Sequence, residues 1–192
     1  MKLLEERIVE EGRVLPGNIL KVDMFLNHQI DPKLFQAMGK EFYEKFKHKK
    51  ITKVLTLEVS GIAIAYAAAL EFGVPVLFAK KIESLTISQD VYSSKVISYT
   101  KNKTYDIRVD KKFLTEEDHV LIIDDFMANG EAMKGLINLC NQAGATVEAI
   151  GIAIEKTFQK GGKTIREQGY DIESLAMIKA FEEGKVVFEE RD

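Results

Sequence analysis

The chain has 192 residues, 46% of them hydrophobic, which suits one globular domain with a buried core. Its 27 basic and 30 acidic residues leave a net charge of -3, so overall charge gives no case for nucleic-acid binding. One cysteine excludes an internal disulfide, and three histidines disfavour a histidine-built metal centre. Acids in residues 1–14, where a signal peptide would be apolar, and the lack of a long apolar run predict a cytoplasmic protein that does not enter a membrane.

A first helix is predicted to begin at Asp31 and Pro32, a pair typical of helix starts. Its buried face is marked by apolar residues that recur every four positions: Leu34, Met38, Phe42 and Phe46. The basic run at residues 45–50 is interpreted as a solvated helix end whose lysines complement the helix dipole. We therefore expect no nucleic-acid partner at this run.

The next segments indicate a strand–helix–strand unit. Residues 54–57 predict a short buried strand, and residues 61–72 an Ala-rich helix that Gly73 ends in a left-handed conformation. Residues 74–79 predict a second strand. Because the joints are short, the two strands should pair in parallel.

Residues 80–103 are rich in Ser, Thr, Lys and Tyr and are predicted to leave the sheet. Long polar insertions of this kind are disordered tips or functional lids, and composition alone leaves both open.

The second half of the chain continues the alternation of strands and helices. Residues 119–125 predict a buried strand that ends in two acids, and a helix follows from about Gly130, with Cys140 on its buried side. Residues 147–154 predict another buried strand. The runs at 175–180 and 185–188 predict a hairpin. This order predicts an α/β fold with a doubly wound, mainly parallel sheet, whose ligands bind beyond the carboxyl ends of the strands.

The acids Asp124 and Asp125 form the most informative feature, since apolar side chains would otherwise continue the strand. The pair could cap the next helix or form a salt bridge with a lysine. The tight turn that follows, residues 128–132 (the phosphate turn), favours another interpretation. Its backbone N–H groups and the positive end of the helix dipole make an anion site. Acids beside an anion site suit a ligand with hydroxyls and a phosphate, such as ribose 5-phosphate.

Residues 120–132 resemble the phosphoribosyl pyrophosphate signature of the type I phosphoribosyltransferases: four apolar residues, two acids, two apolar residues and a Gly turn. Residues 58–62 are similar to the family's pyrophosphate loop, and Lys80-Lys81 stands where its flexible hood begins. Residues 20–27 and 155–157 resemble the bacterial members that use xanthine. The resemblance implies the type I fold, a mainly parallel twisted sheet flanked by helices. It also implies a single domain over residues 1–192.

Within that domain, the resemblance implies a small base-recognising hood from about 1–30 and 156–192, and a lid over about 81–103. The family also implies a homodimer.

The resemblance implies that Asp124 and Asp125 hold the ribose hydroxyls. Val59 and Ser60 would offer backbone donors to the pyrophosphate, and Lys81 would add positive charge. The 5-phosphate would be wrapped by the residues of the phosphate turn: Ala128, Asn129, Gly130, Glu131 and Ala132. Mg²⁺ would arrive bound to phosphoribosyl pyrophosphate, so no dedicated metal ligand is expected in the protein.

For the purine, the resemblance implies that Lys156 faces the 6-oxo group, while Leu20 and Asn27 close over the base. The implied reaction is purine salvage: xanthine and phosphoribosyl pyrophosphate give xanthosine 5-phosphate and pyrophosphate. Two alternatives stay open, a transferase for guanine or hypoxanthine and a regulator that senses phosphoribosyl pyrophosphate without transferring it. The regulators carry an additional DNA-binding domain, for which the roughly 30 residues before the first predicted helix leave no room.

The phosphate turn departs from the family's pattern. Asn129 and Ala132 stand where many relatives have threonine, so backbone donors should carry more of the phosphate binding. Glu131 places an acid near a dianion, which Coulomb's law disfavours unless the side chain turns away.

Overall fold

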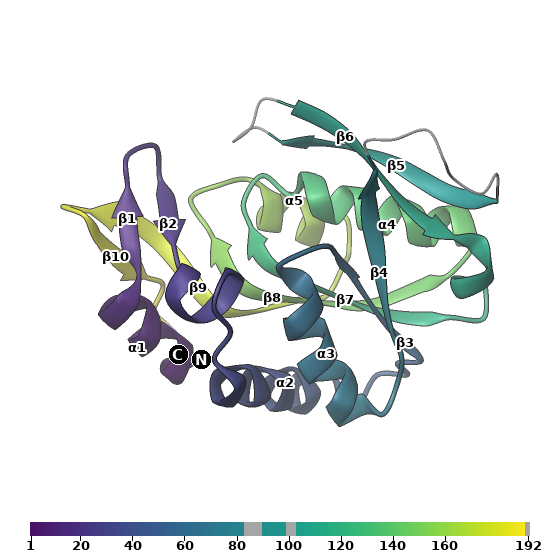
Figure 1. Ribbon diagram of the computed structural model, residues 1–192, viewed down its shortest axis with the longest axis horizontal. Coiled ribbons are helices and arrows are strands. Elements are labelled where there is room, and N and C mark those ends of the chain that lie inside the picture. The colour runs from purple at the N-terminus through teal and green to yellow at the C-terminus, as the bar shows by residue number, and fades with distance from the viewer. Residues whose placement is uncertain (83–89, 99–102, 191–192) are drawn as a thin grey trace.

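The computed structural model describes residues 1–82, 90–98 and 103–190, and its centre is an eight-stranded sheet (Figure 1). In spatial order the strands are β10 (Lys185–Phe188), β9 (Ile172–Glu182), β8 (Thr146–Lys156), β7 (His119–Met127), β3 (Lys53–Leu57), β4 (Val76–Ile82), β6 (Lys103–Asp110) and β5 (Val91–Ser98). Among the described residues, no helix has the length and apolar character needed to cross a lipid bilayer.

The middle of the sheet is parallel. β9, β8, β7, β3 and β4 pair in parallel in that order, whereas β10, β6 and β5 add antiparallel strands at the two sides. The predicted mainly parallel sheet and the parallel pairing of β3 with β4 are therefore confirmed. Parallel strands bring their carboxyl ends to one edge of the sheet, where the loops can form a site.

Helices cover both faces of this sheet. One core joins α1 (Lys2–Glu11), α2 (Pro32–Phe46) and α3 (Gly61–Phe72) to the sheet. The other joins α4 (Glu131–Ala143) and α5 (Gly161–Glu167) to the opposite face. Figure 1 shows α2 and α3 below the sheet, with α4 and α5 above it. This confirms the doubly wound architecture.

The predicted helix ends follow from their capping residues. The Asp31 carboxylate accepts hydrogen bonds from the amides of Lys33 and Leu34, which satisfies free donors at the start of α2. Gly73 ends α3 at φ +67°, the left-handed conformation predicted for it. At the other end of α2, Lys45 and Lys49 pair with acids that flank the start of β9, at 2.8 Å each.

Several N-terminal elements were not predicted. Before α2 the structure has α1, a hairpin of β1 (Arg13–Leu15) and β2 (Ile19–Lys21), and a π-helical turn, η1 (Asp23–Asn27). The expectation that about 30 residues precede the first helix is therefore wrong. Only Leu4 and Ile8 of α1 are buried, so its sequence has little helical periodicity. The short helix α5 was also missed, because it begins with two glycines.

Part of the polar segment 80–103 belongs to the sheet. β4 continues to Ile82, and residues 91–98 form β5, which pairs with β6 as an antiparallel hairpin. The predicted excursion is therefore wrong for residues 91–98. Its period-two alternation was the signal of a strand. Residues 83–89 and 99–102 lie outside the described residues, so the lid over 81–103 stays a prediction.

The N- and C-terminal segments predicted to form a hood lie together. α1 contacts β9 and β10, and β1 contacts β10. The amino group of Met1 donates to the carbonyl of Leu175 on β9. Figure 1 shows the hairpin β1–β2 beside β10 at one end of the molecule. The division into a hood and a main body stays a prediction.

Candidate active site

The residues singled out from the sequence gather at the carboxyl ends of three neighbouring parallel strands. β3 leads into the pyrophosphate loop (residues 58–62), β7 carries the two acids and leads into the phosphate turn, and β8 ends with Lys156. β7 lies between β3 and β8 in the sheet. The topology therefore places the predicted sugar site between the predicted pyrophosphate and purine sites.

Asp124 and Asp125 (the carboxylate pair) lie near the end of β7 and are held by backbone amides. The amide of Asp125 donates to Asp124 Oδ1 and the amide of Phe126 to Asp125 Oδ1, both at 3.0 Å. Asp124 is 6% exposed and Asp125 is partly exposed. In the described part of the chain neither carboxylate forms an ion pair with a basic side chain. The alternative of a structural salt bridge is therefore not what the structure shows for these residues.

The pKa values of the carboxylate pair reflect burial without a paired cation. Burial, followed by the negative charge of Asp125, raises the pKa of Asp124 well above its usual range. Burial also raises the pKa of Asp125. Without a ligand, the pair therefore favours binding a proton over carrying two charges. Perturbed carboxylates of this kind are enriched at functional sites.

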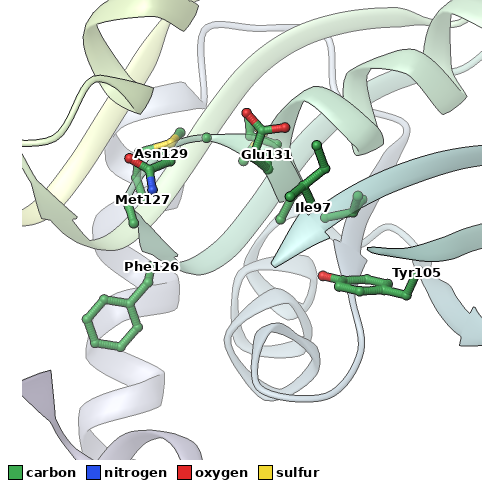
Figure 2. A pocket seen from close by; sticks show the side chains of 11 residues that line it. Ile97, Tyr105, Phe126, Met127, Asn129 and Glu131 are labelled. Carbon is green, nitrogen blue, oxygen red and sulfur yellow. The ribbon is translucent and has the colours of Figure 1, made fainter. Parts of the chain in front are cut away.

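The phosphate turn is open to a ligand. Gly130 adopts φ +81° and places the following residues at the start of α4. Within the described structure, the amides of residues 129–132 donate to no protein acceptor, as expected for the first turn of a helix. The turn borders a cavity of about 180 Å³ that β5 and β6 complete on the other side (Figure 2). These donors and the helix dipole make the turn suited to a phosphate group.

Glu131, the acid within the phosphate turn, is paired with a lysine. Lys134 Nζ lies 2.7 Å from Glu131 Oε1, one helical turn along α4. Because this pairing offsets the negative charge, repulsion between Glu131 and a bound phosphate is reduced.

The pyrophosphate loop joins β3 to α3. The peptide bond between Glu58 and Val59 is cis, and the Val59 side chain is 76% exposed. Ser60 precedes the first residue of α3 and makes no side-chain cap. Glu58 accepts a hydrogen bond from the amide of Lys81, at 2.5 Å. This contact holds the backbone of Lys81 on β4 against the loop.

Lys81 also lies near the carboxylate pair. Its positive charge acts to lower the pKa of both Asp124 and Asp125, although the effect of burial is larger. Its Nζ lies 5.3 Å from the centroid of the Tyr105 ring on β6. Lys81 thus contacts the loop through its backbone and acts on both acids through its charge.

On the base side, Lys156 is half-buried and engaged by the N-terminal hairpin. Its Nζ donates to the carbonyl of Asn18, the turn residue between β1 and β2, at 2.8 Å. The rings of Phe126 and Phe181 lie 5.6 and 5.8 Å from the same Nζ. Burial lowers the pKa of Lys156. The cation therefore stands in a largely aromatic environment.

The other two predicted purine contacts are less closely connected to Lys156. Leu20 lies on β2, two residues from Asn18, and is buried. Asn27 ends η1 and has an exposed side chain. Among the described contacts, none joins Asn27 to Lys156.

The family can be assigned by comparison with known proteins. A family model described as phosphoribosyl transferase domain matches residues 24–189. The chain belongs to this phosphoribosyltransferase family. A curated relative from Finegoldia magna, named xanthine phosphoribosyltransferase, is 61% identical over 99% of this chain and 100% of its own length. A relative of the same name from Ruminiclostridium cellulolyticum is 56% identical over 99% of this chain and 100% of its own length.

The phosphoribosyltransferase fold is also found among solved structures. A crystal structure of adenine phosphoribosyltransferase from Rhodothermus marinus is similar with a TM-score of 0.75 and 20% identity. The match covers 93% of this chain and 100% of that one. At this identity the likeness supports the fold alone.

Sequence reasoning missed a close backbone contact between Gly161, at the start of α5, and the phosphate turn (the Gly161 brace). The amide of Gly161 donates to the carbonyl of Ala128 at 3.0 Å. A Cβ at Gly161 would lie only 2.4 Å from that carbonyl oxygen and 2.5 Å from the amide nitrogen of Gly130. The two backbones therefore approach as closely as glycine allows. The pair Gly161-Gly162 was the signal in the sequence.

An ion pair holds the second glycine of this brace. Glu155, the residue before Lys156, is 1% exposed and accepts two hydrogen bonds from Arg166 of α5, at 2.6 and 2.7 Å. The hydroxyl of Ser174 also donates to Glu155. A Cβ at Gly162 would lie 1.9 Å from Glu155 Oε1. α5 is thus fixed to the end of β8 by a fully buried carboxylate.

Replacing Asp124 by asparagine should stabilise the free protein at neutral pH. Because the pKa of Asp124 is raised, the folded state keeps a proton that the unfolded chain loses above about pH 4, so stability falls as pH rises through this range. Asp124→Asn removes the titratable group, so the variant should not lose this stability as pH rises. Thermal unfolding at several pH values should show a higher unfolding temperature at pH 7.5 and a smaller difference near pH 4.

Asp118→Asn is the matched control. Burial acts to raise the pKa of Asp118, but hydrogen bonds from Lys53 and Thr115 outweigh it and lower the pKa. This substitution should therefore destabilise the protein at neutral pH. A loss of stability in Asp124→Asn at pH 7.5 would contradict the interpretation of the carboxylate pair.

Gly161→Ala should displace the phosphate turn. We expect the Michaelis constant for phosphoribosyl pyrophosphate to rise about 10- to 100-fold, since small displacements of binding groups have effects of this size. Gly39→Ala is the control, because its Cβ would meet the carbonyl oxygen of Ala67 at 2.4 Å between α2 and α3. It should lower the unfolding temperature without this kinetic effect. Equal Michaelis constants in both variants would show that the Gly161 brace does not position the phosphate turn for substrate binding.

Proposed function

We propose that this protein transfers the 5-phosphoribosyl group of phosphoribosyl pyrophosphate to N9 of xanthine, giving xanthosine 5-phosphate and pyrophosphate. The observation that carries the proposal is the carboxylate pair, without a cationic partner among the described residues, beside the open amides of the phosphate turn. The names of the relatives supply the purine, since those at 54–61% identity are called xanthine phosphoribosyltransferase. They favour this enzyme over a regulator and over a guanine or hypoxanthine transferase.

In this proposal the sugar is held at its two ends. Asp124 and Asp125 accept hydrogen bonds from the ribose 2- and 3-hydroxyls, and the phosphate turn binds the 5-phosphate through its backbone amides. The backbone of Val59 and Ser60 binds the pyrophosphate, with Lys81 adding positive charge. The supporting observation is that these groups lie at adjoining strand ends of one sheet.

The residues then act by orientation and electrostatics. The bond from the anomeric carbon to pyrophosphate breaks, the bond to purine N9 forms, and the proton on N9 is released to water. The ribose ring becomes positively charged in the transition state, and the carboxylate pair lies close to that charge. No covalent intermediate with the protein is needed, because positioning and charge stabilisation lower the barrier.

Mg²⁺ is proposed to enter as part of the substrate, bound to phosphoribosyl pyrophosphate. Mg²⁺ sheds its water reluctantly and binds substrate phosphates, so no dedicated protein ligand is proposed for it. The bound ion would neutralise charge on the departing pyrophosphate.

Lys156 is proposed to select the purine, with Leu20 and Asn27 closing over the base. An ammonium has donors and no acceptor, so it favours a 6-oxo group over the 6-amino group of adenine. The contact of Lys156 with Asn18 uses one of its three donors and leaves others for a ligand. The β1–β2 hairpin thereby stands over the proposed base site.

A homodimer is proposed on the face formed by α2 and α3. Tyr66 and Leu70 of α3 are 59% and 62% exposed, and Ile30 is 48% exposed. All three line one groove of about 410 Å³, which a second copy would cover. Sedimentation equilibrium should give twice the 21.7 kDa mass of the chain, and a monomer mass would reject this assembly.

The cytoplasm is proposed as the compartment. The single cysteine, Cys140, is buried, and burial raises its pKa to about 12. A protein with one inert thiol and no disulfide needs no oxidising compartment.

The reaction is tested by incubating the protein with phosphoribosyl pyrophosphate, Mg²⁺ and each of xanthine, guanine, hypoxanthine and adenine. Pyrophosphate release and the nucleotide product are measured. Xanthine should give the highest kcat/KM and adenine no product. Saturable binding of phosphoribosyl pyrophosphate without transfer to any purine would instead indicate a sensor, and preference for another base would overturn the choice of xanthine.

Lys156→Met should weaken xanthine binding without affecting the sugar site. Loss of a charged hydrogen bond predicts a fall in xanthine affinity of about tenfold or more, measured by calorimetry. Affinity for phosphoribosyl pyrophosphate should stay within about twofold of the unmodified protein. Lys160→Met, at a nearby exposed lysine, is the matched control and should bind xanthine normally. Equal losses for both ligands in Lys156→Met would contradict the assignment.

A further inference from the structure

Tyr105 shares the cavity of the phosphate turn, although no role for it follows from the sequence motifs. It lies on β6 and is half-buried, across the cavity from residues 128–132. Figure 2 shows its hydroxyl oxygen directed toward the middle of the pocket, with Asn129 and Phe126 on the opposite side. Its polar atom therefore points at the space a ligand on the turn would occupy.

The remaining walls of this cavity offer few donors. Eleven residues line it, among them Ile97, Tyr105, Phe126, Asn129 and Glu131. Among these eleven, Tyr105 is the one that carries a hydroxyl. Glu131 is an acid already paired with Lys134, so it cannot serve a phosphate. A phosphate held by the amides of the turn still presents oxygens toward β6, and a phenol is a donor for them.

A neighbouring lysine and partial burial keep Tyr105 suited to donating a hydrogen bond to a phosphate. Lys81 Nζ lies 5.3 Å from the ring centroid, so the ring stands beside the proposed pyrophosphate lysine. Burial, and then the negative charge of Asp124, raises the pKa of the Tyr105 hydroxyl. The phenol thus keeps its proton at neutral pH and remains a donor.

We propose that the Tyr105 hydroxyl donates a hydrogen bond to the 5-phosphate of the bound ribose, from the side opposite the phosphate turn. The inference rests on the proposed function and adds a specific substrate contact to it. The turn itself contains no hydroxyl side chain, and the hairpin of β5 and β6 supplies one from across the cavity.

Tyr105→Phe tests the hydroxyl while keeping the ring beside Lys81. Ribose 5-phosphate and pyrophosphate are each titrated into the protein by calorimetry, without a purine. Loss of a hydrogen bond to a charged group predicts an affinity for ribose 5-phosphate about tenfold or more lower, with pyrophosphate affinity within about twofold. In turnover, KM for phosphoribosyl pyrophosphate should rise similarly with little change in kcat, because the contact is made equally in ground and transition states.

Tyr92→Phe is the matched control on the same hairpin. The Tyr92 ring also lies near a lysine, with Lys111 Nζ 5.7 Å from its centroid, and Tyr92 does not line the cavity. This variant should bind ribose 5-phosphate normally. Unfolding temperatures of both variants show whether either substitution disturbs the fold.

Three results would overturn the inference. They are unchanged affinity for ribose 5-phosphate in Tyr105→Phe, an equal loss for pyrophosphate, and an equal loss in Tyr92→Phe. The proposed function fails separately, when the unmodified protein releases no pyrophosphate with any purine. Because the titrations use no purine, they decide the role of Tyr105 whichever base is transferred.

Discussion

The site depends on two adjacent carboxylates near the end of a buried strand. Asp124 is almost inaccessible and, among the described residues, has no paired cation, so its charge is costly in the free protein. The amides of Asp125 and Phe126 hold the two side chains in place. A ligand that brings hydroxyl donors to this point therefore meets two carboxylates that, among the described residues, have no paired cation.

Three neighbouring strands bring different groups to the carboxylate pair. β3 supplies a loop next to Lys81, β7 supplies an open helix start, and β8 supplies a lysine between two aromatic rings. The strand order puts β7 in the middle, so the acids lie between the loop after β3 and Lys156 at the end of β8. An ion pair between the buried Glu155 and the partly exposed Arg166 anchors α5 at the end of β8. Positioning by rigid strands and helices suits a reaction that proceeds by orientation.

Much of this could be predicted from the sequence because the signals were local. Alternating strands and helices predicted the parallel sheet, and the run ending at Asp124 and Asp125 predicted where a sugar would bind. The hydrophobic periodicity of the sequence was weakest in elements that bury few side chains of their own. α1 buries only two side chains, and β5 looked like a polar excursion because one of its faces is exposed.

Other features had no sequence signal that periodicity could detect. The contact of Lys156 with Asn18 joins residues 138 positions apart, and the place of Tyr105 depends on the pairing of the β5–β6 hairpin with β4. The choice of purine came from resemblance and not from the pattern of residues. Long-range pairing of this kind becomes visible only when the strand order is known.

The close approach of Gly130 and Gly161 has a consequence for how such sequences diverge. Gly130 needs a left-handed backbone, and a Cβ on it would lie 3.0 Å from the Cα of Gly161. A Cβ on Gly161 would meet the backbone of the turn in return. Neither position can acquire a side chain while the other stays in place. Drift at one is therefore tolerated only with a compensating backbone shift at the other, so the two segments are expected to be inherited as a matched set.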